Sequence, residues 1–193
     1  MRLRARLFKR DSQVNNIKQY LEKHGFGRFE PKAVLFDMDG VLYDSMSRQS
    51  IAWQRSMALF GIHMTEADAY ATEGARGIDT IRKMVMQQKG EEITQEEAQK
   101  MYDEKTRQFH AMGEPPLMPG ILGLMEHIQS QGLRIGVVTG SGQRPLINRL
   151  MTDFKDYLDE QHIVTAYDVT QGKPAPAPYL MGMQKARTEP WQT

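Results

Sequence analysis

The sequence contains no cysteine among its 193 residues. Disulfide bonds, zinc sites built on thiolates and cysteine nucleophiles are therefore excluded. A chain without cysteine is also typical of a reducing compartment, so we expect a cytoplasmic protein.

The sequence also lacks long apolar segments and a strong excess of charge. No apolar run approaches the roughly 18 residues that a membrane-spanning helix requires. The first ten residues are basic, but no apolar stretch follows them as a secretory signal would need. The 25 basic and 24 acidic side chains leave a formal net charge of +1, which argues against a nucleic-acid-binding protein. We therefore expect a globular protein with no membrane partner and no nucleic-acid partner.

Residues 1–30 are expected to precede the main domain as a basic arm and an accessory helix. Apolar side chains recur there at helical spacing until Gly25 ends the run. After a proline comes the segment AVLF (33–36), which is short and continuously apolar, as buried parallel strands are. Asp37 follows directly, so it should lie at the carboxyl end of this strand.

Residues 47–113 show helical patterns and no strand pattern. One helical pattern ends at Gly61 and a second at Gly90. A third begins with Thr94 and Glu97, which have the spacing of a capping box. This region is therefore predicted to be an all-helical insertion, or cap.

The segment GEPPLMPG, with three prolines and two glycines, ends the insertion because it cannot continue a helix. We expect residues 31–46 and 114–193 to form one core domain. In its second part, the apolar segments LRIGVVTG and IVTAYDV (163–169) alternate with amphipathic helical patterns. Such alternation predicts an α/β fold, with a Rossmann-like parallel core in three layers and the helical cap inserted into it.

Polar residues follow each of the three predicted strands. Because the carboxyl ends of parallel strands meet at one edge of the sheet, these residues should lie close together. Carboxylates, hydroxyls, backbone N–H groups and an ammonium in one place suit a phosphate ligand. The residues are Asp37, Asp39, Thr139, Gly140, Ser141 and Lys173.

This residue set suits phosphoryl transfer. Asp37 can attack phosphorus to form an aspartyl-phosphate, and Asp39 can protonate the leaving alkoxide and later deprotonate water. Thr139, the backbone after it and Lys173 can hold the phosphate oxygens. Two anions do not approach each other unaided, so we expect Mg²⁺ between Asp37 and the phosphate.

The same segments resemble the haloacid dehalogenase-like superfamily, in particular its phosphatases and phosphomutases with a helical cap. DMDGVLYDS, VVTGSG and GKPAPAPYL are similar to its first three motifs, in the family's order and with the cap between the first two. The resemblance covers roughly residues 32–187. It implies that Asp37 is the nucleophile and a metal ligand, and that Asp39 is the acid/base and reaches the metal through its backbone carbonyl. It also implies that Thr139 and Lys173 bind phosphate.

A closer resemblance is to members similar to β-phosphoglucomutase, whose helix after the first motif has a His and then a Trp four residues later. Trp53 matches, whereas Gln49 stands at the position of the His. In the cap, the resemblance implies substrate-phosphate contacts for Arg76 and Lys105. A mutase has to rebind a phosphorylated intermediate and exclude water, so Gln49 favours a phosphatase acting on a small phosphorylated substrate over a mutase.

Two departures from the family pattern concern the metal site. Ala177 stands where the third motif often has an acidic residue, and the acidic pair of the fourth motif has no counterpart in this sequence. We therefore expect an incomplete metal site and hypothesise that the chain is a fragment or a split-gene product of a longer enzyme. The strand at 33–36 would then be an exposed edge able to associate with another chain. A catalytically impaired binding subunit that retains the fold is the third alternative.

Overall fold

The computed structural model describes residues 16–193. The predicted basic arm and the start of the first helix lie outside the described residues. The rest of that helix covers residues 16–24 and ends before Gly25, whose φ is 69°. Phe26, which follows the helix, contacts Trp191 with ring centroids 5.2 Å apart, so the two ends of the described chain are in contact.

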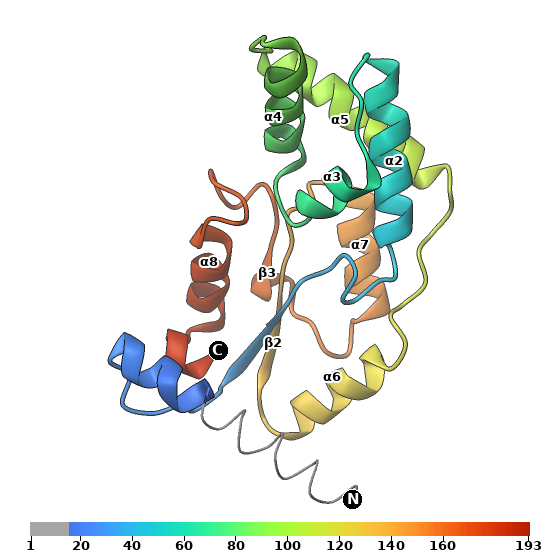
Figure 1. The fold of residues 1–193 in the computed structure, drawn as a ribbon. Coiled ribbons are helices and arrows are strands. Elements are labelled where there is room, and N and C mark those ends of the chain that lie inside the picture. The colour runs from blue at the N-terminus through green and yellow to red at the C-terminus, as the bar shows by residue number, and fades with distance from the viewer. Residues whose placement is uncertain (1–15) are drawn as a thin grey trace, which may run out of the picture.

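The sheet consists of three parallel strands in the order β1-β2-β3. They are β1 (Ala33–Phe36), β2 (Arg134–Val138) and β3 (Ile163–Val164). β1 pairs with β2 along its whole length, and the last two residues of β2 pair with β3. This arrangement confirms the predicted parallel α/β fold. Figure 1 shows that the carboxyl ends of the strands point towards the cap.

Helices cover both faces of the sheet. α6 (Ile121–Ser130) and α7 (Arg144–Asp153) lie on one face, and α8 (Ala177–Ala186) lies on the other (Figure 1). On the first face, alternate strand residues pack against the two helices in one hydrophobic cluster. On the second face, α8 comes so close that a Cβ on Gly182 would lie 2.9 Å from side-chain atoms of Leu35 and Val138. The result is the predicted three-layer core.

The cap contains α2 (Met46–Leu59), α3 (Glu66–Ala71), α4 (Gly77–Lys89) and α5 (Gln95–His110). Its buried side chains form a second hydrophobic cluster, separate from that of the core. Thr94 and Glu97 form the predicted capping box at the start of α5. α3 was not predicted, although Thr65 and Asp68 form a capping box of their own.

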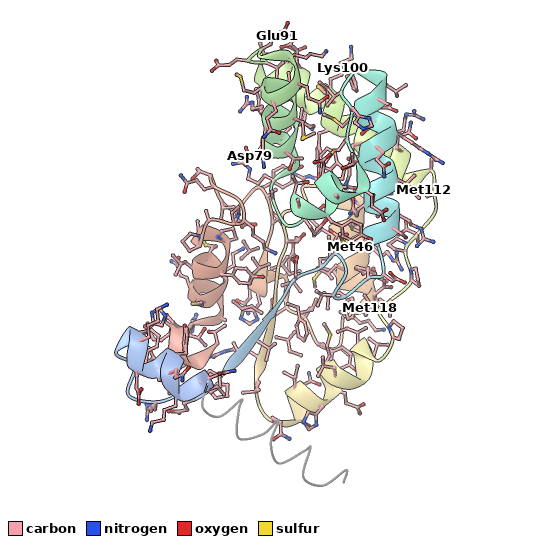
Figure 2. All side chains as sticks on the ribbon, in the orientation of Figure 1. Met46, Asp79, Glu91, Lys100, Met112 and Met118 are labelled. Carbon is pink, nitrogen blue, oxygen red and sulfur yellow. The ribbon has the colours of Figure 1, made fainter. Side chains whose placement is uncertain are left out.

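The two chain segments that join cap and core run beside each other. The backbone N–H of Asp44 donates to the Pro116 carbonyl at 2.9 Å, and that of Met118 donates to the Leu42 carbonyl at 2.8 Å. Figure 2 labels Met118 at this junction, while Glu91 and Lys100 mark the far end of the cap. The cap is therefore attached to the core by a short paired connection.

The third strand is shorter than the predicted segment 163–169. It ends at Val164, because the Asp168 carboxylate accepts hydrogen bonds from the backbone N–H and the hydroxyl of Thr165, both at 2.8 Å. These bonds fold the next residues into a turn. The prediction of a strand beyond Val164 was wrong.

Within residues 16–193, β1 has only β2 as a strand partner. The chain just before it is covered in part, since the N–H groups of Glu30 and Lys32 donate to the carbonyls of Trp191 and Gln192 at 2.9 and 2.7 Å. Association through this edge stays a prediction. In the same part of the chain, every helix is too short or too polar to cross a membrane.

Candidate active site

Asp37 directly follows β1 and is held by an ion pair. Its Oδ2 lies 2.8 Å from the Lys173 ammonium, and its Oδ1 accepts the backbone N–H of Met38 at 2.7 Å. Lys173 also donates to the Val138 carbonyl at the end of β2, again at 2.8 Å. One ammonium thus joins the ends of two strands, and Asp37 and Lys173 lie together as the strand topology predicts.

Asp39 is only 8% exposed and has a different environment. Its Oδ1 accepts hydrogen bonds from the Ser45 hydroxyl at 2.6 Å and from the Gln49 amide at 2.8 Å. Between Asp39 and Ser45 the chain turns at Gly40, which has a φ of 71° and donates its N–H to the Tyr43 carbonyl. The turn therefore brings Ser45 and the start of α2 back onto the carboxylate.

Thr139, Gly140 and Ser141 form a tight loop between β2 and α7. The Thr139 hydroxyl accepts the N–H of Ser141 at 3.0 Å, and the Ser141 hydroxyl accepts the N–H of Gln143 at 3.2 Å. Position 140 has room only for a glycine, because a Cβ there would lie 2.8 Å from the Ala75 carbonyl oxygen and closer still to that of Gly74. The loop is thus pressed against a segment of the cap.

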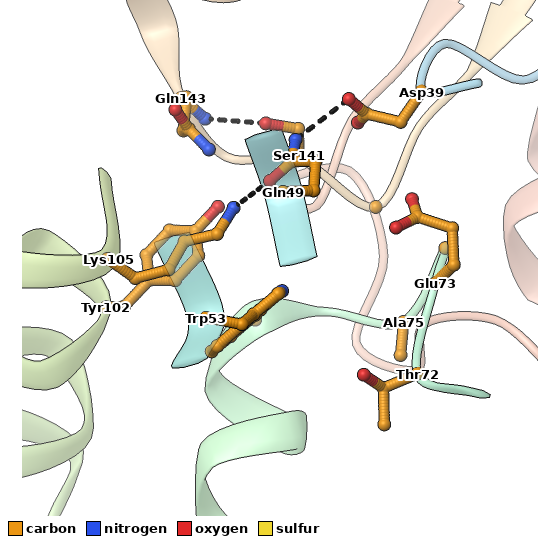
Figure 3. A pocket seen from close by; sticks show the side chains of 13 residues that line it. Asp39, Gln49, Trp53, Thr72, Glu73, Ala75, Tyr102, Lys105, Ser141 and Gln143 are labelled. Carbon is orange, nitrogen blue, oxygen red and sulfur yellow. Dashed lines mark hydrogen bonds between the residues drawn. The ribbon is translucent and has the colours of Figure 1, made fainter. Parts of the chain in front are cut away.

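A pocket lies between this edge of the core and the cap. The core contributes Asp39 and the loop after β2, and the cap contributes side chains from α2 and α5 and the segment after α3 (Figure 3). The free space inside measures about 30 Å³, which is room for one or two water molecules. The lining residues are Asp39, Gln49, Trp53, Thr72, Glu73, Gly74, Ala75, Gly77, Tyr102, Lys105, Gly140, Ser141 and Gln143.

Lys105, on α5, is 3% exposed and donates to the Gln49 side-chain oxygen. The Gln49 amide therefore connects the Lys105 ammonium to the Asp39 carboxylate. The ammonium also lies 5.1 Å from the centre of the Trp53 ring system. Burial lowers the pKa of Lys105 to about 8, although the negative charges of Asp39 and Glu73 act in the opposite direction.

Glu73 is a pocket residue that the sequence analysis missed. It follows α3 and reaches the pocket from the cap, on the side opposite Lys105 (Figure 3). Burial, and then the negative charge of Asp39, raise the pKa of Glu73 to about 7, while the Gly74 N–H and Lys105 act against this. A single glutamate in a loop between helices has no spacing that would mark it in a sequence.

Arg76 was predicted to contact the substrate phosphate from the cap, and this contact stays a prediction. Its side chain does not line the pocket, and neither do those of Asp37, Thr139 and Lys173. Its guanidinium donates to the Thr170 carbonyl of the core and lies 3.6 Å from the Asp79 carboxylate. Tyr102, by contrast, was not predicted. Its oxygen accepts the N–H of Gly142 across the interface at 3.4 Å, and burial raises its pKa. Both side chains fasten the cap to the core.

The oxygen atoms of Asp37 and Asp39 are the donors available for a divalent cation. Residues 16–193 contain no cluster of three or more acidic, histidine or cysteine side chains that could hold a metal. Mg²⁺ nevertheless fits this donor set, because proteins often bind it through one or two carboxylates together with phosphate oxygens and water.

Residues of the first two motifs of the predicted family thus line this pocket. Lys173 of the third motif pairs with Asp37 of the first, although neither of these two side chains lines the pocket. A family model described as haloacid dehalogenase-like hydrolase matches residues 34–193. The chain belongs to this family.

Individual relatives are phosphatases and phosphomutases. The chain is 29% identical to hexitol phosphatase A of Escherichia coli, over 79% of this chain and 68% of that protein. It is 25% identical to β-phosphoglucomutase of Bacillus subtilis, over 77% and 67%. A solved structure of a candidate β-phosphoglucomutase from Bacteroides vulgatus is 40% identical, has a TM-score of 0.86 and is matched over 91% of this chain and 71% of that chain. These similarities identify an enzyme of the phosphatase or phosphomutase type.

Proposed function

We propose that the protein is a magnesium-dependent phosphatase that releases phosphate from a small sugar phosphate, or a related organic phosphate, through an aspartyl-phosphate at Asp37. The observation that carries the proposal is the pairing of Asp37 with Lys173, 2.8 Å apart, beside the loop after β2. A carboxylate, an ammonium and backbone N–H groups at one edge of the sheet support the roles of nucleophile and phosphate-binding groups proposed for them. The names of the relatives, hexitol phosphatase A among them, support the same class of substrate.

The reaction takes two steps. In the first, an Asp37 carboxylate oxygen bonds to phosphorus, the bond from phosphorus to the alcohol oxygen breaks, and Asp39 gives its proton to the departing alkoxide. In the second, Asp39 takes a proton from water, the water oxygen bonds to phosphorus, and the bond to Asp37 breaks. Such proton transfer contributes about 10²–10⁴ in rate. Magnesium, when bound, offsets the charge of the phosphate beside Asp37.

Gln49, which contacts Asp39, favours hydrolysis over the mutase reaction. The Gln49 amide donates to Asp39 and accepts from Lys105, and an amide has no titratable proton to exchange with either group. Lys105 therefore does not pass a proton to Asp39 through Gln49. Asp39 is needed as a base in both reactions, so the preference for hydrolysis rests on Gln49 at the position of the mutase histidine, since a mutase has to exclude water. The mutase is kept as second candidate because of the similarity to the B. subtilis enzyme.

We expect the cap to move when a substrate binds. The pocket has room for one or two water molecules, not for a sugar phosphate. The cap loop at Gly74 and Ala75 would have to separate from Gly140, and the hydrogen bond between Tyr102 and Gly142 would have to break. The paired connection between cap and core leaves such a movement possible.

A panel of phosphomonoesters, assayed with and without Mg²⁺, tests the proposal. The proposal expects net phosphate release that depends on Mg²⁺ and that Asp37→Asn abolishes. Interconversion of hexose phosphate isomers without net phosphate release would identify the mutase instead. No turnover of any substrate by the folded wild-type chain would favour the catalytically impaired binding subunit.

A further inference from the structure

Glu73 brings an acidic side chain into the pocket and forms no ion pair within residues 16–193, although the charge of Lys105 acts on it from the opposite side. Its position is fixed, because the cap segment at Gly74 and Ala75 is pressed onto Gly140 of the core and a Cβ on Gly74 would lie 2.8 Å from the Lys173 side chain. Glu73 therefore sits beside Asp39, where the part of a substrate that follows the scissile oxygen must lie.

The two cap cations that were predicted to contact phosphate, Lys105 and Arg76, donate to other groups. Lys105 donates to Gln49 and lies among aromatic rings on the opposite side of the pocket (Figure 3). Arg76 donates to the Thr170 carbonyl outside the pocket. Above pH 7, where Glu73 is ionised, a second phosphate group on the substrate would approach a carboxylate, and the repulsion between like charges would weaken its binding.

A second acceptor in the pocket also has no donor. Gln143 is 4% exposed, and its side-chain oxygen has no hydrogen-bond partner in the structure. Burying an amide oxygen without a partner is unfavourable unless a ligand supplies the donor. A ligand that carries hydrogen-bond donors would therefore suit both Glu73 and Gln143. Trp53 adds an apolar surface to the same pocket.

We propose that Glu73 and Gln143 form a hydroxyl-binding subsite, which selects the phosphomonoester of a polyhydroxylated alcohol and disfavours substrates with a second phosphate. The inference rests on the phosphatase activity proposed above and adds the chemistry of the leaving group to it. Substrate hydroxyls donate to the Glu73 carboxylate and to the Gln143 oxygen once the cap closes. Hydrogen bonds to a carboxylate are stronger than those to a neutral acceptor, so Glu73 makes the larger contribution.

The kinetic test compares three substrates: sorbitol 6-phosphate, phenyl phosphate, which has no hydroxyl groups, and a hexose 1,6-bisphosphate. Glu73→Gln and Glu73→Ala should lower kcat/KM for sorbitol 6-phosphate, relative to phenyl phosphate, by about tenfold. Both should raise the relative kcat/KM for the bisphosphate. Glu91→Gln, the same change at an exposed position at the far end of the cap, should leave all ratios as in the wild type.

Unchanged ratios in both Glu73 variants would overturn the subsite. Calorimetric binding of sorbitol 6-phosphate and phenyl phosphate, without added metal, separates this result from a failure of the proposed function. If the wild type hydrolyses none of the substrates, the phosphatase proposal fails. The subsite is then still supported by a loss of about tenfold in the affinity ratio on Glu73→Gln, and is overturned by a constant ratio.

Discussion

The charged groups in the core half of the site have a different environment from those in its cap half. The core half includes Asp37 and Lys173, which lie outside the lining of the pocket. In the core half, Asp37 is paired with Lys173 at 2.8 Å, and Asp39 accepts two side-chain hydrogen bonds. In the cap half, Lys105 is buried and Glu73 is half-buried on the opposite side of the pocket, with pKa values moved to about 8 and about 7. The charged groups of the core half are paired or hydrogen-bonded, whereas Glu73 of the cap and Gln143 of the core loop after β2 leave acceptors for a ligand. We infer that the core carries the reaction and that selection of the substrate depends on groups of both the cap and the core.

The largest expected effect concerns the core half. Asp37→Asn removes the nucleophile and leaves Lys173 without its carboxylate partner, so we expect kcat to fall by about 10⁴ or more. Steady-state phosphate release measures the fall, and circular dichroism controls for folding. A folded Asp37→Asn protein that kept more than a tenth of the wild-type kcat would break the comparison, because the reaction would then not depend on this group.

Asp39→Asn should have the next largest effect, and it should depend on the leaving group. An asparagine cannot supply a proton, so we expect kcat for a sugar phosphate to fall by about 10²–10⁴. The loss in the first step should be smaller for p-nitrophenyl phosphate, whose leaving group needs no proton. Burst kinetics with both substrates separate the two steps. Equal losses in the first step would show that Asp39 does not act as the acid.

Gly140→Ala tests the contact between the two halves. The added Cβ would collide with the carbonyls of Gly74 and Ala75, which we expect to cost about 1–3 kcal/mol of cap closure and to lower kcat/KM accordingly. Gly123→Ala, in α6, is the matched control, since a Cβ there meets no atom within 4 Å. Equal activity of the two variants would mean that closure of the cap onto Gly140 is not needed for turnover.

The smallest expected effect is on the pH dependence of stability. The pKa of Glu73 is raised from 4.5 to about 7 in the fold, so its contribution to stability is full below pH 4.5 and is lost as the pH rises through 7. Glu73→Gln should therefore gain stability relative to the wild type between pH 4.5 and 7.5. Urea unfolding at both pH values measures the gain, with Glu91→Gln as control. A difference that stays constant with pH would show that Glu73 is not buried as described.

The core half could be predicted from the sequence, and most of the cap half could not. Asp37, Thr139 and Lys173 follow strands, and the topology of a parallel sheet brings strand ends together whatever the details of packing. Glu73 depends on tertiary contacts, because a loop residue becomes a pocket residue only through the packing of its neighbours on Gly140.

The contact that Arg76 makes in the structure could not be predicted from the sequence either. The residue type suits a phosphate, but the position of its guanidinium is decided by a carbonyl of Thr170 that is distant in sequence. The end of β3 was missed for a similar reason, because the side chain of Asp168 turns the chain at Thr165. Local sequence patterns thus predicted most helices and strands, whereas the Arg76 contact and the end of β3 depend on side-chain contacts that these patterns do not contain.

Trapping the intermediate tests the central claim most directly. Borohydride reduces an aspartyl-phosphate to homoserine, and peptide mass spectrometry then identifies the residue that was phosphorylated. After brief reaction with substrate and Mg²⁺, the account predicts homoserine at Asp37 and at no other position, and none in protein that received no substrate. Substrate turnover without homoserine at Asp37, or with homoserine at Asp39 or Glu73 instead, would contradict it.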